Sequence, residues 1–435
     1  MARKQFVLVL SMILAITLMS VSPALAAQKK EIRIAWWGSQ NRHDRTIKVI
    51  QMYMAAHPDI NMTWDFANFN DYFVKRNTEA AGGDLPCIMQ QDYAYVSEWA
   101  TRGLLLPLDD YIKDGTIDTK NIADASLKGG RVNDKLYAVN LGNNSQSFLI
   151  DTDLVKKAGL DMPSPTWTWA DFEKMAMALH DKLGIWAIGI GDGLDNNQLW
   201  KSLYLGLGQW SFNDDGTALG YTDDKPLIDY FNMILRLQKA GAIASHERSS
   251  EFVKAGVEGQ PIVKGDAVMS YLWSNQVVAV WKAAGADRHF KLWLLPRSEG
   301  GKSENYIKPS QFFSITAKCE FPKESADFIN FFTNSNDAND ILFAERGIPI
   351  SSTVREHLLP KLDPGSAETF DFLSRVEKDN SPIRPADPPG ANDLFNNVYE
   401  PQFAGPVLYG QLSVEDGVKT LRDQATEILA KNKKS

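Results

Sequence analysis

The chain has 435 residues and a formal net charge of −8, with 46 Lys and Arg against 54 Asp and Glu. This acidic balance argues against nucleic acid or an anionic membrane as the partner, because both attract clustered cations. The two cysteines exclude a disulfide-rich scaffold and a cysteine metal site. They leave open whether Cys87 and Cys319 are bonded or remain two separately buried thiols.

An export signal opens the chain. Arg3 and Lys4 precede an apolar run from Phe6 to Met19 that is too short to span a bilayer, and a small-residue cleavage pattern follows. We expect residues 1–26 to be a signal peptide cleaved after Ala26, and the mature protein to be periplasmic. No cysteine lies near this junction, which argues against a lipid anchor attached there.

The first part of the mature chain alternates strand and helix patterns. A strand from Glu31 runs into a polar loop, and the apolar spacing over residues 44–57 predicts a helix. Residues 60–66 alternate as a half-buried strand, residues 71–81 form a helix-like stretch that stops at two glycines, and residues 87–89 form a short buried strand. This order favours parallel strands joined by crossover helices.

Strand and helix patterns continue to the end of the chain. Further strands are predicted at residues 136–141, 148–150, 185–190, 267–272, 290–295 and 312–315, and further helices at 169–183, 223–241, 323–333 and 336–346. The last hundred residues look helical and loop-rich, with an irregular, proline-rich connection at 382–389. A mature chain of this length exceeds one hydrophobic core, so we expect at least two lobes.

The sequence carries no motif for catalysis. It contains no paired metal-binding histidines, no Gly-x-Ser-x-Gly turn and no phosphate-binding glycine loop. The Asp-Gly pairs are typical of turns and do not continue into a calcium-binding loop. We therefore expect no catalytic residue, no metal and no cofactor, although a pair of carboxylates acting on a glycosidic bond stays open.

Aromatic residues at strand ends and in loops favour a sugar site. Sugars present apolar faces and hydroxyl edges, so they bind flat rings beside amide and charged groups. The predicted ligand-binding residues combine these types and are Trp36, Trp37, Gly38, Arg42, His43, Gln91, Asp92, Tyr93, Asn144, Gln146, Asp192, Trp200, Trp210, Tyr271, Trp273 and Gln311.

Core packing is the alternative for each of these tryptophans, and it is favoured for Trp64 and Trp293 inside predicted strands. Trp36 and Trp37 point to opposite faces of their strand, so only one of them needs to face the site. Arg42 can bind a carboxylate through two hydrogen bonds, as a uronic-acid sugar would require.

Several short stretches, in their order along the chain, resemble the extracellular solute-binding proteins of ABC sugar importers, of the maltose- and glycerol-phosphate-receptor type. They are residues 83–88, 102–109, 148–160, 165–169, 264–269, 323–332 and 347–351. Cys87 stands where this family usually has Asp. Within the family, Trp36-Trp37-Gly38 with Arg42, His43 and Thr46, and the stretch 345–349, look most like receptors for oligogalacturonides and related plant-wall saccharides.

The resemblance implies an α/β, periplasmic-binding-protein-like fold of two lobes, each a sheet flanked by helices, joined by a hinge. The expected lobes are residues 27–138 with about 285–335, and residues 139–284 with about 336–435. It also implies a monomer that captures a carbohydrate in the cleft between the lobes and delivers it to a membrane permease. The rival hypothesis is a secreted carbohydrate-active hydrolase or lyase. A surface adhesin is a third, against which the lack of repeats and anchors weighs.

Overall fold

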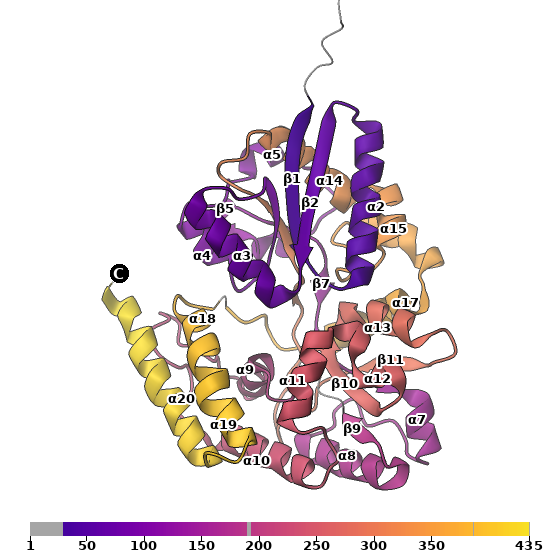
Figure 1. Cartoon of the computed structure of the whole chain (residues 1–435), viewed down its shortest axis with the longest axis vertical. Helices are drawn as coiled ribbons and strands as arrows, with labels where there is room; N and C mark the ends of the chain where they lie inside the picture. Colours follow the sequence, from indigo (N-terminus) through magenta and orange to yellow (C-terminus); the bar gives the residue numbers. More distant parts are fainter. Residues whose placement is uncertain (1–28, 189–192, 386, 435) are drawn as a thin grey trace, which may run out of the picture.

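The computed structural model describes residues 29–188, 193–385 and 387–434, so the predicted signal peptide and its cleavage site lie outside the described residues. Across these ranges we find no helix with the length and apolar character needed to cross a bilayer. The elements form two groups, one above the other in Figure 1, and each group is built around one β-sheet.

The first sheet has the strand order β2-β1-β3-β13-β6. Its strands are β1 (Lys30–Trp37), β2 (Ile60–Ala67), β3 (Ile88–Gln91), β6 (Val139–Asn140) and β13 (Phe312–Ile315). As predicted, β1 is parallel to both β2 and β3, whereas the later β13 is antiparallel to β3. The helices of this group are α2 (Gln40–Ala56), α3 (Phe69–Gly82), α4 (Val96–Thr101), α5 (Asp109–Lys113), α6 (Asp124–Lys128), α14 (Pro322–Asn334), α15 (Asn336–Leu342) and α16 (Ser352–Leu358), with the small hairpin β4 (Arg131–Val132) and β5 (Lys135–Leu136).

The second sheet has the order β11-β8-β10-β9. Its strands are β8 (Gln146–Asp151), β9 (Trp186–Ile188), β10 (Ala267–Trp273) and β11 (Phe290–Trp293). Its larger helices are α8 (Trp169–Leu183), α9 (Asn197–Gly206), α10 (Lys225–Lys239), α11 (His246–Ala255), α13 (Val277–Ala284), α17 (Pro364–Lys378) and α20 (Val414–Leu429). Shorter pieces are α7 (Thr152–Lys157), η1 (Val257–Gly259), α12 (Pro261–Lys264), η2 (Ser274–Gln276), η3 (Leu359–Lys361), α18 (Ala391–Leu394), η4 (Phe395–Ala404), α19 (Gly405–Leu408) and η5 (Ala430–Lys434).

Helix ends follow from local sequence. Thr168 and Asp171 form the predicted capping box at the start of α8, and Gly184 ends that helix in the left-handed conformation. Helix α2 begins earlier than the apolar spacing predicts, because the Ser39 side chain accepts a hydrogen bond from the Arg42 backbone N–H. The capping residue therefore brings the predicted polar loop into the first turn of α2.

The chain crosses between the two groups three times in the described residues, through 140–146, between β11 and β13, and between α16 and α17. The first two crossings meet where β7 (Asn143–Asn144) pairs with β12 (Lys308–Pro309), and Asn143 also bridges Ile348, in the segment between α15 and α16. We call residues 140–144, 308–312 and 346–348 the hinge ribbon. Gly347 is needed there, since a Cβ on it would meet the Asn143 carbonyl oxygen at 2.5 Å.

Two segments belong to a different group of elements from the lobe in which the sequence places them. Strand β11 pairs with β8 of the second sheet, although residues from about 285 are expected in the first lobe. Helix α15 packs against α2, and α16 against α15, although residues from about 336 are expected in the second lobe. The sequence patterns of these short elements do not indicate which sheet an element joins. The boundaries expected near residues 285 and 336 therefore differ from those that the strand and helix contacts show.

Cys87 and Cys319 form a disulfide, which settles the alternative that the sequence leaves open. Cys87 precedes β3 and Cys319 follows β13, its antiparallel neighbour, and the Thr316 N–H donates to the Cys87 carbonyl oxygen. The bond joins positions 232 residues apart, so the whole second sheet lies within the closed loop. The disulfide therefore fixes both ends of this 232-residue loop at the first sheet.

Trp36 and Trp37 are both buried in the first group, on opposite faces of β1. The Trp36 Nε1 donates to Nδ1 of His43 at 3.0 Å, and the His43 ring stacks on Phe66 at a centroid distance of 3.9 Å. Trp37 packs against three aromatic residues of α3. This corrects the expectation that one of the two tryptophans presents its ring to a ligand, because α2 and α3 cover both faces of the strand.

Trp64 is more exposed than predicted. It lies on β2, the edge strand of the first sheet, and 36% of its surface is exposed. The alternating pattern places Trp64 on the same face as Ile60 and Met62, which are buried, so this face of β2 is covered only over the first part of the strand. Trp293 of β11 is half-buried against the core of the second group.

Arg42 belongs to a buried polar network at the hinge ribbon. Its Nε donates to both carboxylate oxygens of Glu345, at 2.8 and 3.0 Å, and its Nη1 donates to the Trp37 carbonyl oxygen. The Asn275 side chain donates to the Glu345 carbonyl oxygen at 2.7 Å and accepts from Asn144 at 2.6 Å. These contacts engage the guanidinium, which corrects the expectation that Arg42 offers it to a sugar carboxylate.

Loss of the disulfide is expected to lower the free energy of unfolding by roughly 2–5 kcal/mol, because the cross-link restricts the unfolded chain. The measurement is urea unfolding of the oxidised protein and of the Cys87→Ser, Cys319→Ser double variant. Reductant should move the wild-type midpoint to that of the variant and leave the variant unchanged. A wild-type midpoint that does not respond to reductant would contradict the bond.

Arg42→Met is expected to destabilise the protein by about 3–5 kcal/mol, because it leaves the buried Glu345 carboxylate with only the more distant Arg346 Nη1, at 3.4 Å, as a cationic partner. Adding Glu345→Gln should recover part of the loss in urea unfolding. The control is Arg102→Met, which breaks an exposed ion pair with Glu98 and should cost no more than about 1 kcal/mol. Strictly additive losses in the double variant would show that the pair is not coupled.

His43 makes stability depend on pH. Burial, together with the charges of Arg42 and Arg346, lowers the pKa of His43 to about 4. The unfolded imidazole takes up its proton near its ordinary pKa of about 6.5, so between these values the unfolded state binds more protons and stability falls as pH falls.

We expect His43→Gln to flatten this loss, by up to about 3 kcal/mol between pH 7 and pH 4, because its amide can still accept from Trp36. Unfolding free energies of both proteins at four pH values in this window provide the measurement. Parallel pH profiles would rule out His43 as the source.

Candidate functional site

Five of the remaining predicted residues lie where the two groups face each other. Gln91 ends β3, and Asp92 and Tyr93 follow it directly. On the second sheet, Gln146 begins β8 and pairs with Trp273 at the end of β10. Ligands of α/β folds are met at the carboxyl ends of strands, which is where β3 and β10 place these side chains.

Lys308 of the hinge ribbon connects the two sides. Its ammonium lies 3.7 Å from a carboxylate oxygen of Asp92 and 4.5 Å from the ring centroid of Trp273. The other carboxylate oxygen of Asp92 accepts from the Ala94 N–H at 2.9 Å, which fixes the loop after β3. The first and second groups therefore meet through a lysine that sequence reasoning does not single out.

A second path between the groups runs through Arg384, in the connection between α17 and α18. Its backbone carbonyl accepts from the Tyr93 hydroxyl at 3.4 Å. Its guanidinium donates to the Tyr306 hydroxyl at 2.7 Å and to Gln198 at 2.9 Å. The Tyr306 and Trp273 rings meet edge to face at a centroid distance of 6.5 Å. With the Lys308 contacts, this path closes a ring of neighbouring residues, which we call the interlobe site: Asp92, Tyr93, Arg384, Tyr306, Trp273 and Lys308.

Buried amides flank the interlobe site with unused hydrogen-bonding atoms. The side-chain oxygens of Gln91 and Gln311 and the side-chain nitrogen of Gln146 are buried, and none has a hydrogen-bond partner among the described residues. Gln91 pairs with Phe312, the first residue of β13, and Gln311 directly precedes that strand. Unpartnered buried polar atoms are costly, and they are expected where a ligand completes them.

The arrangement suits a polyhydroxylated ligand. It offers amide donors and acceptors, charged groups of both signs and aromatic rings, which together match hydroxyl edges and apolar ring faces. A pocket of about 270 Å³ adjoins the interlobe site at Tyr93, and its lining includes Lys128 and Arg131.

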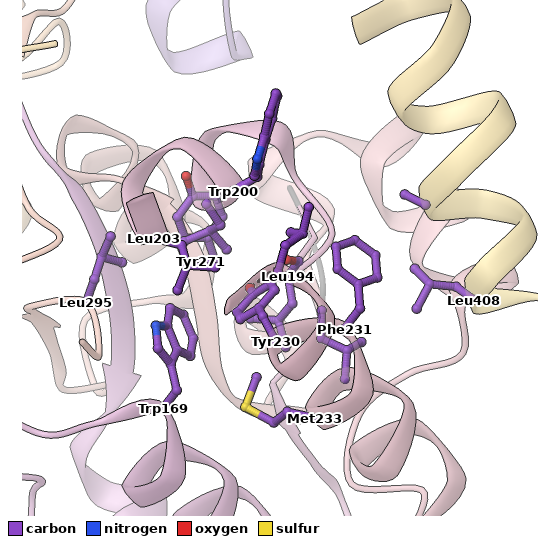
Figure 2. Packing of buried hydrophobic residues seen from close by; sticks show 14 of the residues in the cluster. Trp169, Leu194, Trp200, Leu203, Tyr230, Phe231, Met233, Tyr271, Leu295 and Leu408 are labelled. Atoms are coloured by element: carbon purple, nitrogen blue, oxygen red, sulfur yellow. Dashed lines mark hydrogen bonds between the residues drawn. The ribbon is translucent and has the colours of Figure 1, made fainter. Parts of the chain in front are cut away.

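The other predicted residues lie elsewhere. Trp200 and Tyr271 pack in the core of the second group, with Trp169 and Tyr230 close by (Figure 2). The Trp200 ring stacks on Tyr399 at a centroid distance of 5.4 Å, so core packing, the alternative weighed for each tryptophan, holds here.

The last four predicted residues have structural positions. Asn144 is a hinge residue, and Gly38 lets the Arg42 side chain lie against the loop, since a Cβ would come within 2.3 Å of it. Trp210 is half-buried in the turn after α9, and Asp192 lies outside the described residues.

Lys308, Tyr306 and Arg384 are the residues of the interlobe site that the sequence does not predict. Lys308 and Tyr306 precede Gln311 in the same crossing. Their closeness in the sequence to this predicted residue could have indicated them as site residues. Arg384 comes from the proline-rich connection, and no local pattern reveals that this connection reaches the other group.

Among the described residues, Asp195, His246 and Glu400 could hold a metal ion. The two carboxylates lie 3.2 Å and 3.3 Å from different nitrogens of the imidazole, and hydrogen bonds to them raise the pKa of His246 to about 10. A protonated imidazole donating to both carboxylates accounts for the group without a metal.

The sequence matches the family of bacterial extracellular solute-binding proteins over residues 48–364. The fructooligosaccharide ABC transporter substrate-binding protein FusA of Streptococcus pneumoniae is 26% identical over 142 residues, which are 28% of this chain and 26% of FusA. The match thus spans about a quarter of that relative's length.

Solved structures share the fold over nearly the whole chain. An extracellular solute-binding protein family 1 member from Alicyclobacillus acidocaldarius is 28% identical, with a TM-score of 0.65, covering 93% of this chain and 99% of that one. A periplasmic oligogalacturonide binding protein from Yersinia enterocolitica, in complex with saturated digalacturonic acid, is 22% identical with a TM-score of 0.80, covering 92% and 99%. The predicted fold is confirmed, and the chain belongs to the bacterial extracellular solute-binding proteins.

Proposed function

We propose that this protein is the substrate-binding receptor of an ABC transporter, which captures an oligosaccharide between its two lobes and delivers it to a membrane permease. The observation that carries the proposal is the convergence of unpartnered amides from both groups, Gln91 and Gln311 on one side and Gln146 on the other, around the interlobe site. A sugar bound there supplies the missing hydrogen bonds and joins the two sides.

The comparisons support this ligand class. FusA is named for fructooligosaccharides, and the Yersinia protein holds digalacturonic acid. A uronic-acid-containing fragment of the plant cell wall is the acidic candidate among such ligands. We further propose that the receptor acts as a periplasmic monomer and that nucleic acid is not a partner.

The proposed lobes are the two groups of elements, with the hinge ribbon between them. The proposed ligand contacts are Gln91, Asp92, Tyr93, Gln146, Trp273 and Gln311, together with Tyr306, Lys308 and Arg384. Binding favours the closed arrangement only by the difference in affinity between closed and open states, which contacts to both lobes provide.

A secreted hydrolase or lyase is the rival from another class. Incubation with candidate polysaccharides separates the two, because an enzyme generates new reducing ends or unsaturated products and a receptor does not. We propose that the protein generates neither.

A thermal-shift panel of neutral and acidic oligosaccharides tests the receptor. A bound sugar at about 100 times its Kd should stabilise the native state by roughly 2.7 kcal/mol. Gln146→Ala should weaken the best sugar at least about tenfold, because it removes a buried hydrogen-bonding group. The matched control is Gln209→Ala, in the exposed turn after α9, which should bind like the wild type. No shift with any sugar, or wild-type binding by Gln146→Ala, would overturn the proposal.

A further inference from the structure

Lys308 is a nearly buried cation with unused donors. Its side chain is only 10% exposed. Within the described part of the chain, no protein acceptor lies within hydrogen-bond distance of its ammonium, and the nearest carboxylate oxygen, on Asp92, is 3.7 Å away. The Trp273 ring attracts the charge but takes none of the three N–H donors. The ammonium is thus held in place while its donors stay available.

Lys201 shows what a satisfied buried lysine looks like in the same region. Its side chain is fully buried, and its ammonium donates to Asp387 at 2.6 Å. The two lysines therefore differ in one respect that matters for a ligand. Lys201 has a close carboxylate partner in the protein, whereas Lys308 has only a distant one.

Charge around the interlobe site also favours an anion. Lys308, Lys201 and Arg384 bring three positive charges, and Asp92 and Asp387 bring two negative ones, which leaves one positive charge in excess. The chain as a whole carries −8. A local positive excess inside an acidic protein attracts an anionic group to this place.

We propose that Lys308 determines specificity by binding the carboxylate of an acidic sugar. The inference rests on the proposed function, since it assigns a charged contact within the same site. Asp92 competes with the ligand for this ammonium and thereby sets how strongly the acidic group is preferred. The carboxylate of the sugar takes the hydrogen bonds that Asp92 is too far away to accept.

The alternative is that Lys308 only ties the two lobes together, since Asp92 lies in the first group and Trp273 in the second. The two roles differ in what Asp92→Asn does. Asn can still accept from the Ala94 N–H, so the loop should keep its form. If Lys308 is only a tether, the acidic and neutral ligands change equally. If it binds the sugar carboxylate, removing the competing charge strengthens the acidic ligand alone.

The experiment is calorimetric titration with two probes, digalacturonic acid and its neutral, carboxyl-reduced counterpart galactobiose. The wild type should bind the acid at least about tenfold more tightly. Lys308→Gln should weaken the acid about 10- to 100-fold and the neutral sugar little, whereas Asp92→Asn should strengthen the acid and leave the neutral sugar unchanged. Lys282→Gln is the control, because that lysine donates to Asn41 across the two groups outside the interlobe site.

Equal affinity of the wild type for the two probes, binding of neutral sugars only, or equal losses for both probes in Lys308→Gln would overturn the role of Lys308. These results would not contradict the proposed function as a sugar receptor. Absence of binding by every sugar of the panel would instead overturn the proposed function, and the inference with it. Native circular dichroism and unfolding midpoints of each variant show that any loss does not come from misfolding.

Discussion

The fold depends on how two chain crossings and the segment 346–348 pack side by side in the buried hinge ribbon. Their polar groups are shielded from water, so each needs a partner in the protein. The Arg42 to Glu345 ion pair, extended through Asn275 to Asn144, supplies these partners and joins α2 of the first group to the end of β10 in the second. A buried ion pair contributes little net stability, but breaking it is costly, so it fixes where the crossings meet.

The hinge ribbon and the interlobe site both contain buried amide side chains, but these differ in how many of their hydrogen bonds are made. The amides of Asn144 and Asn275 bond to one another, and they hold the ribbon. Gln91, Gln146 and Gln311 are as buried but retain unpartnered atoms, and they surround the interlobe site. Hydrogen-bond completion therefore separates the residues that hold the ribbon from the residues that we propose bind the ligand. The same distinction separates Lys201 from Lys308 among the cations.

Local sequence predicts the elements well, because capping at Thr168 and alternation along β1 depend on neighbouring residues alone. It predicts strand ends that carry site residues, such as Gln91 and Trp273. Prediction fails where contacts between residues far apart in the sequence determine the position of a side chain. Trp200 is stacked on Tyr399, and Arg42 is paired with Glu345, 303 residues away. Lys308 and Arg384 escape prediction for the same reason, since a chain crossing brings Lys308 beside Asp92 and the α17–α18 connection brings Arg384 beside Tyr93.

In the mechanism that we propose, the two lobes close on an oligosaccharide around the hinge ribbon. Small-angle X-ray scattering of the protein, with and without the sugar that gives the largest thermal shift, tests it most directly. Saturating sugar should lower the radius of gyration as the lobes close. A radius of gyration that stays the same under saturating sugar would contradict it.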